Sequence, residues 1–267
     1  MIWLLPWESS NDVRHTHWAL YALLAINIGV HVLLVIGGEV RQAMWYGDYA
    51  LVPGDMVWYQ WITSSFLHAG WWHLFANMMF LWLFGDNVED VLGPWGFLLL
   101  YFIGGFLGDL LYVSSNPDAL IPNVGASGCI AAVAGAHAVL FASRPVSFKV
   151  MLLVVPMWTV NMRALWLLLL WFAADIFQTM SARGVMDAPG SNYVVHAGGF
   201  VFGFLIGIAA RFHGVVVRYE TLPQGHRWFG YWPQGLEREF KRKRMEELRR
   251  ERATVERPER RTSGPWR

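Results

Sequence analysis

The stretch HWALYALLAINIGVHVLLVI, residues 17–36, holds twenty residues and contains no Lys, Arg, Asp or Glu. A helix needs about 20 mostly apolar residues to cross the hydrocarbon core of a bilayer. No basic region precedes this stretch and no small-residue cleavage site follows it, so it does not have the pattern of a removable signal peptide. We therefore interpret it as a retained membrane-spanning helix, the first of the chain.

The composition extends this interpretation to most of the chain. Hydrophobic residues make up 55% of the sequence and charged residues only 15%, against roughly 25% charged residues in a soluble domain. The run 150–158 is too short for a crossing and is interrupted by Pro156. The sequence therefore predicts an all-α membrane protein with six transmembrane helices between residues 17 and 212. After the first span, the other five are expected at residues 67–84, 96–113, 124–141, 164–179 and 193–212.

Charge indicates how these helices are oriented. From residue 215 to the end, 14 Lys and Arg face 8 Asp and Glu, so this segment carries +6 and the rest of the chain −5. Basic segments usually lie on the cytoplasmic side, near anionic lipid. With six crossings, we expect a cytoplasmic N-terminal segment over residues 1–16 and a basic cytoplasmic tail over residues 213–267. The fourth and sixth spans then run parallel, and residues 39–60 form an outer loop.

A serine opens the fourth span, in the tetrapeptide GASG at residues 125–128. The unpaired amides and the positive dipole end at a helix amino terminus can stabilise an oxyanion formed beside Ser127. Glycines on both sides of the serine permit the close approach of another backbone. Small residues are also common where membrane helices pack, so the tetrapeptide alone favours packing over catalysis.

His196 lies about one turn into the sixth span, at a depth comparable to that of Ser127. Two parallel helices with small-residue stripes can pack backbone to backbone, which would bring the serine and the imidazole within hydrogen-bond reach. The alternative for His196 is a histidine that is hydrogen-bonded inside the bundle. Ser127 and His196 are each followed by small residues at helical spacing. These are Gly199, Gly203 and Gly207 after His196, and Ala131, Ala134 and Ala138 after Ser127.

A third polar cluster lies on the second span. His73 and Asn77 are four residues apart and share one helix face, where both could donate hydrogen bonds to an oxyanion. A metal site formed by His68, His73 and His196 is an alternative, but no H-E-x-x-H arrangement and no acidic ligand accompanies these histidines. Cys129 is alone, so a thiolate cage is excluded. We expect no metal and no cofactor.

Together these motifs resemble the rhomboid family of intramembrane serine proteases over residues 67–211. The resemblance implies that Ser127 and His196 form a catalytic dyad, and that His73, Asn77 and the backbone amide of Ser127 bind the oxyanion. The residues that carry it occur in family order: Phe66-Leu67-His68, His73, Asn77 and Glu89, then Gly125-Ala126-Ser127-Gly128, then His196-Ala197-Gly198-Gly199-Phe200 with Gly203.

The resemblance also implies a function. It predicts a six-helix rhomboid-like bundle with serine endopeptidase activity toward peptide bonds in or near the transmembrane segments of other proteins. The expected partners are such substrates and the lipid bilayer, without nucleic acid or metal, and the expected location is the bacterial cell inner membrane. A catalytically inactive rhomboid-like protein that binds membrane helices is the alternative. A small transporter would predict paired repeats or broken helices, and the sequence shows neither.

Two features depart from the family pattern. Trp45 and Trp58 are each followed by Tyr, where the family often has Trp-Arg, so the anchoring of the first outer loop is open. Many members place an aromatic residue four positions after the serine, but this chain has Ala131 there. We expect Phe200 or an aromatic residue from another span to orient His196 instead.

Other polar residues inside the predicted spans are interpreted as structural. Asp109 and Asp175 lie near the outer ends of the third and fifth spans, where each is expected to reach the interface or to bond a neighbouring helix. His31 and His137 have no matching partners in the sequence.

Overall fold

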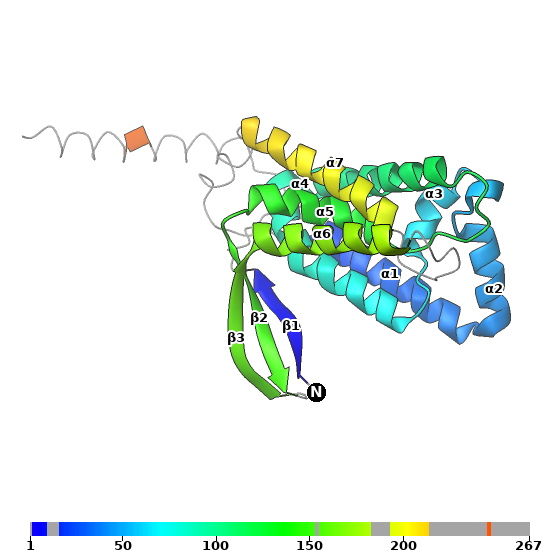
Figure 1. Ribbon diagram of the computed structural model, residues 1–267, viewed down its shortest axis with the longest axis horizontal. Helices are drawn as coiled ribbons and strands as arrows, with labels where there is room; N and C mark the ends of the chain where they lie inside the picture. The colour runs from blue at the N-terminus through cyan, green and yellow to red at the C-terminus, as the bar shows by residue number, and fades with distance from the viewer. Residues whose placement is uncertain (1, 10–15, 153–154, 183–192, 214–244, 247–267) are drawn as a thin grey trace, which may run out of the picture.

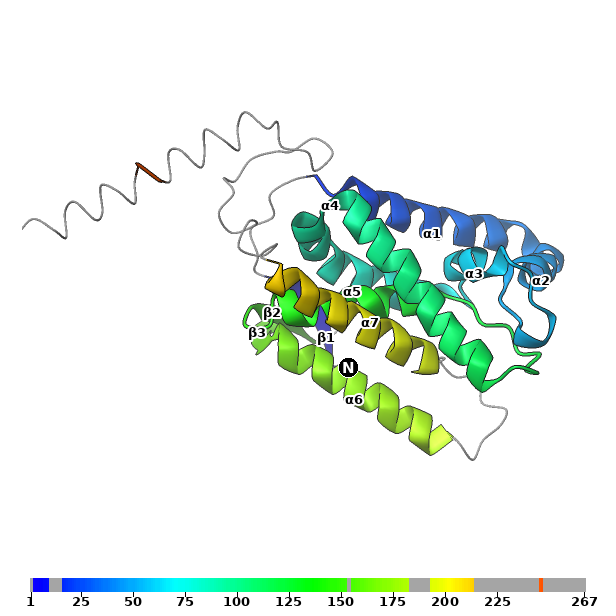
Figure 2. The same cartoon turned by 90° about the horizontal axis from the view of Figure 1, so that it is seen from above.

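The computed structural model describes residues 2–9, 16–152, 155–182, 193–213 and 245–246, and it is mostly helical (Figures 1 and 2). Among the described residues, α1, α4 and α7 are long and apolar enough to cross a membrane, whereas α5 and the first part of α6 are shorter apolar helices. The count of six crossings stays a prediction. The main helices are α1 (Trp18–Ile36), α4 (Trp71–Ser115), α5 (Ser127–Leu140), α6 (Ala164–Ala182) and α7 (Tyr193–Phe212).

Helix α4 contains two helical stretches joined at a kink. Gly93 has non-helical angles, with φ 73° and ψ 165°, and Pro94 follows it. A positive φ is readily adopted only by glycine, and proline has no N–H to continue the helical hydrogen bonds. The two stretches correspond to the second and third helices predicted from the sequence.

The segment between α1 and α4 is more ordered than the predicted loop. It contains α2 (Gly38–Tyr49), η1 (Pro53–Asp55), α3 (Gln60–Thr63) and η2 (Ser64–Phe66). Tyrosine hydroxyl and threonine side chains anchor it: Tyr46 Oη donates to the carbonyl of His68 at 2.6 Å, and Thr63 Oγ1 donates to the carbonyl of Tyr49 at 2.8 Å. These bonds tie the segment together and to the residues that lead into α4.

The expectation of an all-α protein is wrong, because the chain also forms an antiparallel sheet in the order β1-β2-β3. Its strands are β1 (Ile2–Ser9), β2 (Pro145–Leu152) and β3 (Val155–Arg163). The apolar run 150–158, rejected as a crossing, lies in β2 and β3. Parts of β2 and β3 alternate apolar and polar side chains with a period of two, a pattern that a search for long apolar runs does not detect. The N-terminal segment supplies β1, which pairs with β2.

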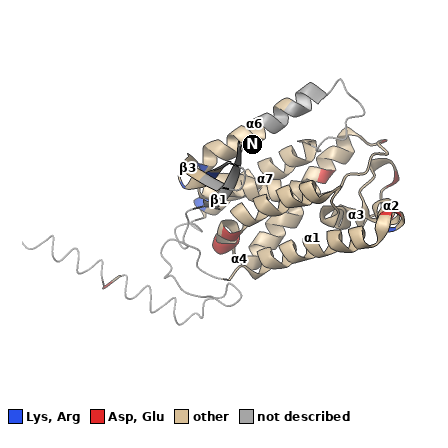
Figure 3. Cartoon of the chain, turned by 90° about the horizontal axis from the view of Figure 1, so that it is seen from below, with Lys and Arg blue, Asp and Glu red and all other residues tan. Residues whose placement is uncertain are grey.

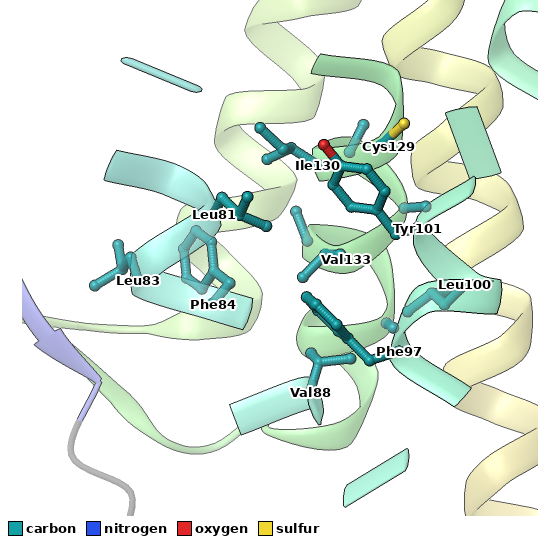
Figure 4. Packing of buried hydrophobic residues seen from close by; sticks show 14 of the residues in the cluster. Leu81, Leu83, Phe84, Val88, Phe97, Leu100, Tyr101, Cys129, Ile130 and Val133 are labelled. Atoms are coloured by element: carbon teal, nitrogen blue, oxygen red, sulfur yellow. The ribbon is translucent and has the colours of Figure 1, made fainter. Parts of the chain in front are cut away.

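Helix α5 lies at the centre of the bundle. Its residues from Gly128 to Ala138 are all buried, as expected for a helix that is apolar on every side. Phe84 from the first stretch of α4 and Phe97 from the second lie on either side of Val133 of α5 (Figure 4). The helix that begins with Ser127 is therefore held in place from several directions.

A buried carboxylate binds the start of α1. The two oxygens of Glu89 accept hydrogen bonds from the backbone amides of Ala19 and Leu20, at 3.2 Å and 2.8 Å. His17, the residue before the helix, makes no capping bond with its side chain. Glu89 therefore supplies the cap from α4, and its negative charge is favourable at the positive end of the α1 dipole. Glu89 is one of the residues that carry the resemblance to the family.

Replacing Glu89 with alanine should destabilise the protein markedly. Two buried amides would lose their acceptor, at about 1–3 kcal/mol each, or roughly 2–6 kcal/mol together. Thermal unfolding in detergent measures the effect, and Glu89→Gln should be milder because one amide oxygen can still accept. The matched control is Glu39→Ala on α2, whose side chain is exposed. Equal melting temperatures for Glu89→Ala and Glu39→Ala would contradict this role.

Candidate active site

The backbone of Gly125 lies directly against two polar side chains of α4. A Cβ atom placed on Gly125 would lie 2.8 Å from both Cε1 and Nε2 of His73, and 3.6 Å from Nδ2 of Asn77. Gly125 has a φ of +123°, and its amide donates to the carbonyl of Ser64 at 3.0 Å. Only glycine suits this position, because its φ is strained for other residues and the imidazole leaves no room for a side chain.

Asn77 has a free donor in this region. Its side chain is 7% exposed, and its Nδ2 atom has no hydrogen-bond partner among the described residues. A buried donor without a partner is uncommon in proteins and calls for an explanation, such as a ligand or a reacting group. The imidazole of His73, one turn earlier on α4, is half-buried beside it.

Ser127 is the first residue of α5, two positions after Gly125, and it is half-buried. No side chain caps the helix at Ala126. The first amides of α5 therefore lack intrahelical acceptors and point toward the segment that carries Gly125. The serine hydroxyl thus lies at a helix amino terminus whose backbone amides can donate hydrogen bonds.

Helices α5 and α7 pack in parallel through glycines, as the sequence predicts. A Cβ atom on Gly199 would collide with the carbonyl oxygen of Gly128, and one on Gly203 would collide with that of Ala132. A Cβ on Gly207 would lie 3.0 Å from the carbonyl oxygen of Ala136. Both helices thus advance by four residues at each contact, so their backbones touch over two turns.

The α7 stripe is the predicted one, but the α5 stripe differs. The atoms nearest to the three α7 glycines belong to residues 128, 131, 132, 136 and 139 of α5 and its end. Of the predicted α5 stripe, only Ala131 is among these residues, at 3.3 Å from a Cβ on Gly199. The predicted stripe is counted from Ser127 at helical spacing. The observed contact instead involves the residues whose backbone carbonyls face α7.

This packing places His196 beside the start of α5. Val195, its neighbour in sequence, contacts Gly128, where a Cβ would lie 2.5 Å from Cγ1 of Val195. Gly199, one turn after His196, touches Gly128 as well. The structure therefore gathers the four predicted residues, Ser127, His196, His73 and Asn77, in one region.

Aromatic rings from two helices hold the His196 ring. Trp171 of α6 lies with its ring centroid 5.9 Å away, and Tyr193 of α7 approaches edge-on at 6.3 Å. Phe200 instead stacks on Phe172, at 4.4 Å. Of the two supports expected in place of an aromatic residue at position 131, the aromatic from another span is the one observed against His196.

The segment before Gly125 is fixed by a buried carboxylate. Asn123 Nδ2 donates to Asp109 Oδ1 at 2.7 Å, and Asp109 is 4% exposed. The backbone of Asn123 also pairs with that of Leu51, through bonds of 2.8 Å and 3.1 Å. Asp109 is expected from the sequence to reach the interface or to bond a neighbouring helix, and its partner is instead the connecting segment that leads into α5. The side chain of Asp175 lies outside the described residues, as do nearly all residues of the predicted basic tail.

The remaining histidines have packing contacts. The His137 ring lies between Phe84 and Phe141, at 4.8 Å and 5.0 Å, inside the apolar core. His31 of α1 packs edge-on against Trp71 at 4.7 Å. Within the described part of the chain, no group of three His, Cys, Asp or Glu side chains is arranged to hold a metal ion.

Sequence reasoning missed the support that surrounds the predicted residues. Trp171 lies in an apolar helix of a chain that is rich in tryptophan, and its spacing does not mark it as a contact of His196. The bond between Asp109 and Asn123 joins positions on both sides of a loop, although Asn123 stands close to the GASG tetrapeptide. Only the folded arrangement shows that Trp171 contacts His196 and that Asp109 holds the segment leading to Ser127.

Comparison with known proteins supports the same region. A family model described as the rhomboid domain matches residues 55–211, which includes the whole stretch of the predicted resemblance. Rhomboid protein 1, mitochondrial, of Saccharomyces cerevisiae is 32% identical over 222 residues, or 80% of this chain. Rhomboid-like protein 11, chloroplastic, of Arabidopsis thaliana is 32% identical over 42% of this chain, and Rhomboid protease GluP of Bacillus subtilis is 30% identical over 43% of it.

These relatives are longer than the aligned regions. The chain covers 60% of the yeast protein, 38% of the Arabidopsis protein and 23% of the Bacillus protein. Their names refer to mitochondria and chloroplasts as well as to a protease of a bacterium, so the bacterial inner membrane expected from the sequence is not supported. The bilayer environment is supported, because the matched domain is that of a membrane-embedded family. The chain belongs to the rhomboid family.

Proposed function

We propose that this chain is an intramembrane serine endopeptidase that hydrolyses peptide bonds in or near the transmembrane segments of other proteins. The observation that supports the proposal is the α5–α7 contact between Gly128, which follows Ser127, and Gly199, which lies one turn after His196. A resemblance in sequence alone cannot distinguish this function from that of an inactive relative. The retained serine, histidine and Asn77 donor favour the enzyme.

The proposed mechanism uses a dyad. Neutral His196 accepts the proton of the Ser127 hydroxyl while its oxygen attacks the carbonyl carbon of the substrate. The carbonyl oxygen becomes negatively charged, and Asn77, His73 and the Ser127 amide donate hydrogen bonds to it. The protonated His196 then gives its proton to the leaving amine, and water hydrolyses the acyl-enzyme in the same way.

The membrane arrangement is part of the proposal. We infer six crossings, with α4 providing two of them on either side of Gly93, and both termini on the cytoplasmic side. Ser127 then faces the outer side, and water reaches it from there. Helix α5 runs parallel to α7, which supports an even number of crossings between the starts of these two helices.

Cleavage of a model single-span protein by detergent-purified enzyme tests the function. Asn77→Ala should keep the dyad but lose one oxyanion donor, which typically lowers kcat about 100- to 1,000-fold. His137→Ala tests the loss of a buried polar side chain far from the proposed chemistry, and should lower stability more than kcat. A chelator should leave the wild-type rate unchanged. Inhibition by the chelator, or full activity of Asn77→Ala, would count against the proposed chemistry.

The bond between Asp109 and Asn123 predicts a rescue. Asn123→Asp would place two carboxyl groups against each other and remove the hydrogen bond. Losing a hydrogen bond to a charged group costs about 1.5–3 kcal/mol. If this whole cost appears in catalysis, kcat/KM falls roughly 10- to 100-fold. The double variant Asp109→Asn with Asn123→Asp restores one amide and one carboxylate. It should recover most of the activity. A double variant no better than Asn123→Asp alone would show that this bond does not position the serine.

A further inference from the structure

The hairpin formed by β2 and β3 has two chemically different faces. Paired residues of antiparallel strands point to the same side of a sheet, and successive residues point to opposite sides. One face is wholly apolar over three consecutive pairs, here called the apolar face: Val146 with Met162, Phe148 with Val160, and Val150 with Trp158. The other, the polar face, carries Pro145 with Arg163, Ser147 with Asn161, and Lys149 with Thr159.

The apolar face is covered on β2 but only partly on β3, where Met162 is half-buried. Val146 is fully buried in the helical core and Phe148 packs against that core. On the neighbouring strand, Trp158 is 57% exposed and Val160 42% exposed. Because Val146 reaches the core, the apolar face is turned toward the bundle. Its exposed part therefore lies beside the helices, on the side where lipid surrounds them.

The hairpin is continuous with a lipid-facing helix surface. Arg163, the last residue of β3, is followed directly by α6, whose Trp166 and Leu170 are 58% and 60% exposed. Figure 1 shows that the strands run across the direction of the helices and project from one end of the bundle. If the helices cross a membrane, strands in this direction lie along its surface.

Charge completes the pattern. Lys149 and Arg163 stand on the polar face, and Arg144 lies just before β2. Figure 3 shows basic residues beside the sheet, at the end of the bundle where acidic residues of α4 also lie. Tryptophan favours the boundary between hydrocarbon and headgroups, and Lys and Arg near a membrane surface are attracted to anionic lipid.

We propose that the β2–β3 hairpin is an interfacial membrane anchor, which lies flat on the bilayer that holds the helices. Its apolar face, with Trp158 and Val160, contacts the boundary of the acyl chains, and its basic residues bind the phosphates of anionic headgroups. This surface is separate from the proposed protease chemistry and depends only on the membrane embedding of the bundle. The occupant is therefore lipid and not a protein partner.

Single spin labels along β3 test the proposal in the full chain, reconstituted in vesicles that contain phosphatidylglycerol. The background carries Cys129→Ala, and each variant adds one cysteine: Trp158→Cys or Val160→Cys on the apolar face, Thr159→Cys or Asn161→Cys as matched controls on the polar face. Accessibility to oxygen, which partitions into lipid, is compared with accessibility to a water-soluble nickel chelate. The ratio should alternate residue by residue and favour oxygen at positions 158 and 160.

Three outcomes would contradict the proposal, the first two in its membrane contact and the third in its lipid-binding charges. Equal nickel accessibility on both faces would mean that the hairpin stands in water. Shielding of positions 158 and 160 from both reagents would mean that protein covers the apolar face. In vesicles of phosphatidylcholine alone, the oxygen preference at both positions should weaken, and an unchanged preference would remove the role of the basic residues. Melting curves of the Cys129→Ala background against wild type show that the fold is intact.

Discussion

Ser127→Ala and His196→Ala should each lower cleavage of a single-span substrate by at least roughly 10⁴-fold, the largest effects expected in this protein. A serine hydroxyl is a weak nucleophile until a neighbouring base removes its proton, so neither residue is useful without the other. The double variant should therefore be no slower than either single one. Initial rates in detergent measure all three variants under the same conditions.

Two controls sharpen this prediction. Ser114→Ala removes a hydroxyl that only bonds the carbonyl of Leu110 within its own helix, and should leave the rate unchanged. A serine-directed covalent inhibitor should label wild-type protein at Ser127, and His196→Ala should suppress the labelling although the serine remains. Substantial cleavage by Ser127→Ala would transfer the nucleophile to another residue and end the dyad hypothesis.

Gly199→Ala is also expected to give a large effect, although it adds only one methyl group. That methyl would overlap the carbonyl oxygen of Gly128 and crowd Ala131 at 3.3 Å, so α7 must move away from α5. A displacement of about 1 Å between reacting groups can cost about 100-fold in rate. We expect a loss of that order in kcat, measured together with the melting temperature to separate misplacement from unfolding.

The matched control is Gly29→Ala in α1. A Cβ atom at Gly29 meets no atom within 4 Å, and alanine is favoured over glycine inside a helix by about 0.5–1 kcal/mol. This variant should be fully active and slightly more stable. If Gly199→Ala cleaves as fast as Gly29→Ala, then the α5–α7 contact does not set the geometry of the dyad.

The sequence predicted the helices well because their signal is local. A run without charges, such as residues 17–36, can only be buried in lipid or protein, and its length determines its class. The stripe of Gly199, Gly203 and Gly207 likewise needs only helical spacing to be recognised. The close approach of α7 to α5 in a parallel arrangement follows from it, and the structure has both.

The sheet was not predictable in the same way. β1 and β2 pair across more than 130 residues, and the strands are short segments whose partners are not specified locally. A hydropathy window as long as a membrane helix averages over the apolar and polar residues that alternate along a strand. The supports of the site share this difficulty, since Trp171 reaches His196 and Asp109 reaches Asn123 only through the fold.

The α5 stripe shows a smaller limit of the same kind. Counting from Ser127 predicts Ala131, Ala134 and Ala138, but the helix presents the carbonyls of Gly128, Ala132 and Ala136 to α7. The pattern of small residues cannot choose between these rows, because almost every residue of α5 is small. Which row faces the partner is set by the rotation of the helix, and this depends on neighbours on all sides.

In the proposed membrane arrangement, the length of α5 determines how deep the serine lies. Fourteen residues make a helix about 21 Å long, while the hydrocarbon core of a bilayer is about 30 Å thick. A helix of this length cannot reach both membrane surfaces, so when its last residue stands at one surface, Ser127 lies roughly 9 Å below the other. At that depth, the backbone groups of an intact substrate helix are already hydrogen-bonded to other backbone groups of the same helix. A protein helix entering from the lipid must therefore unwind locally before its carbonyl can meet the serine.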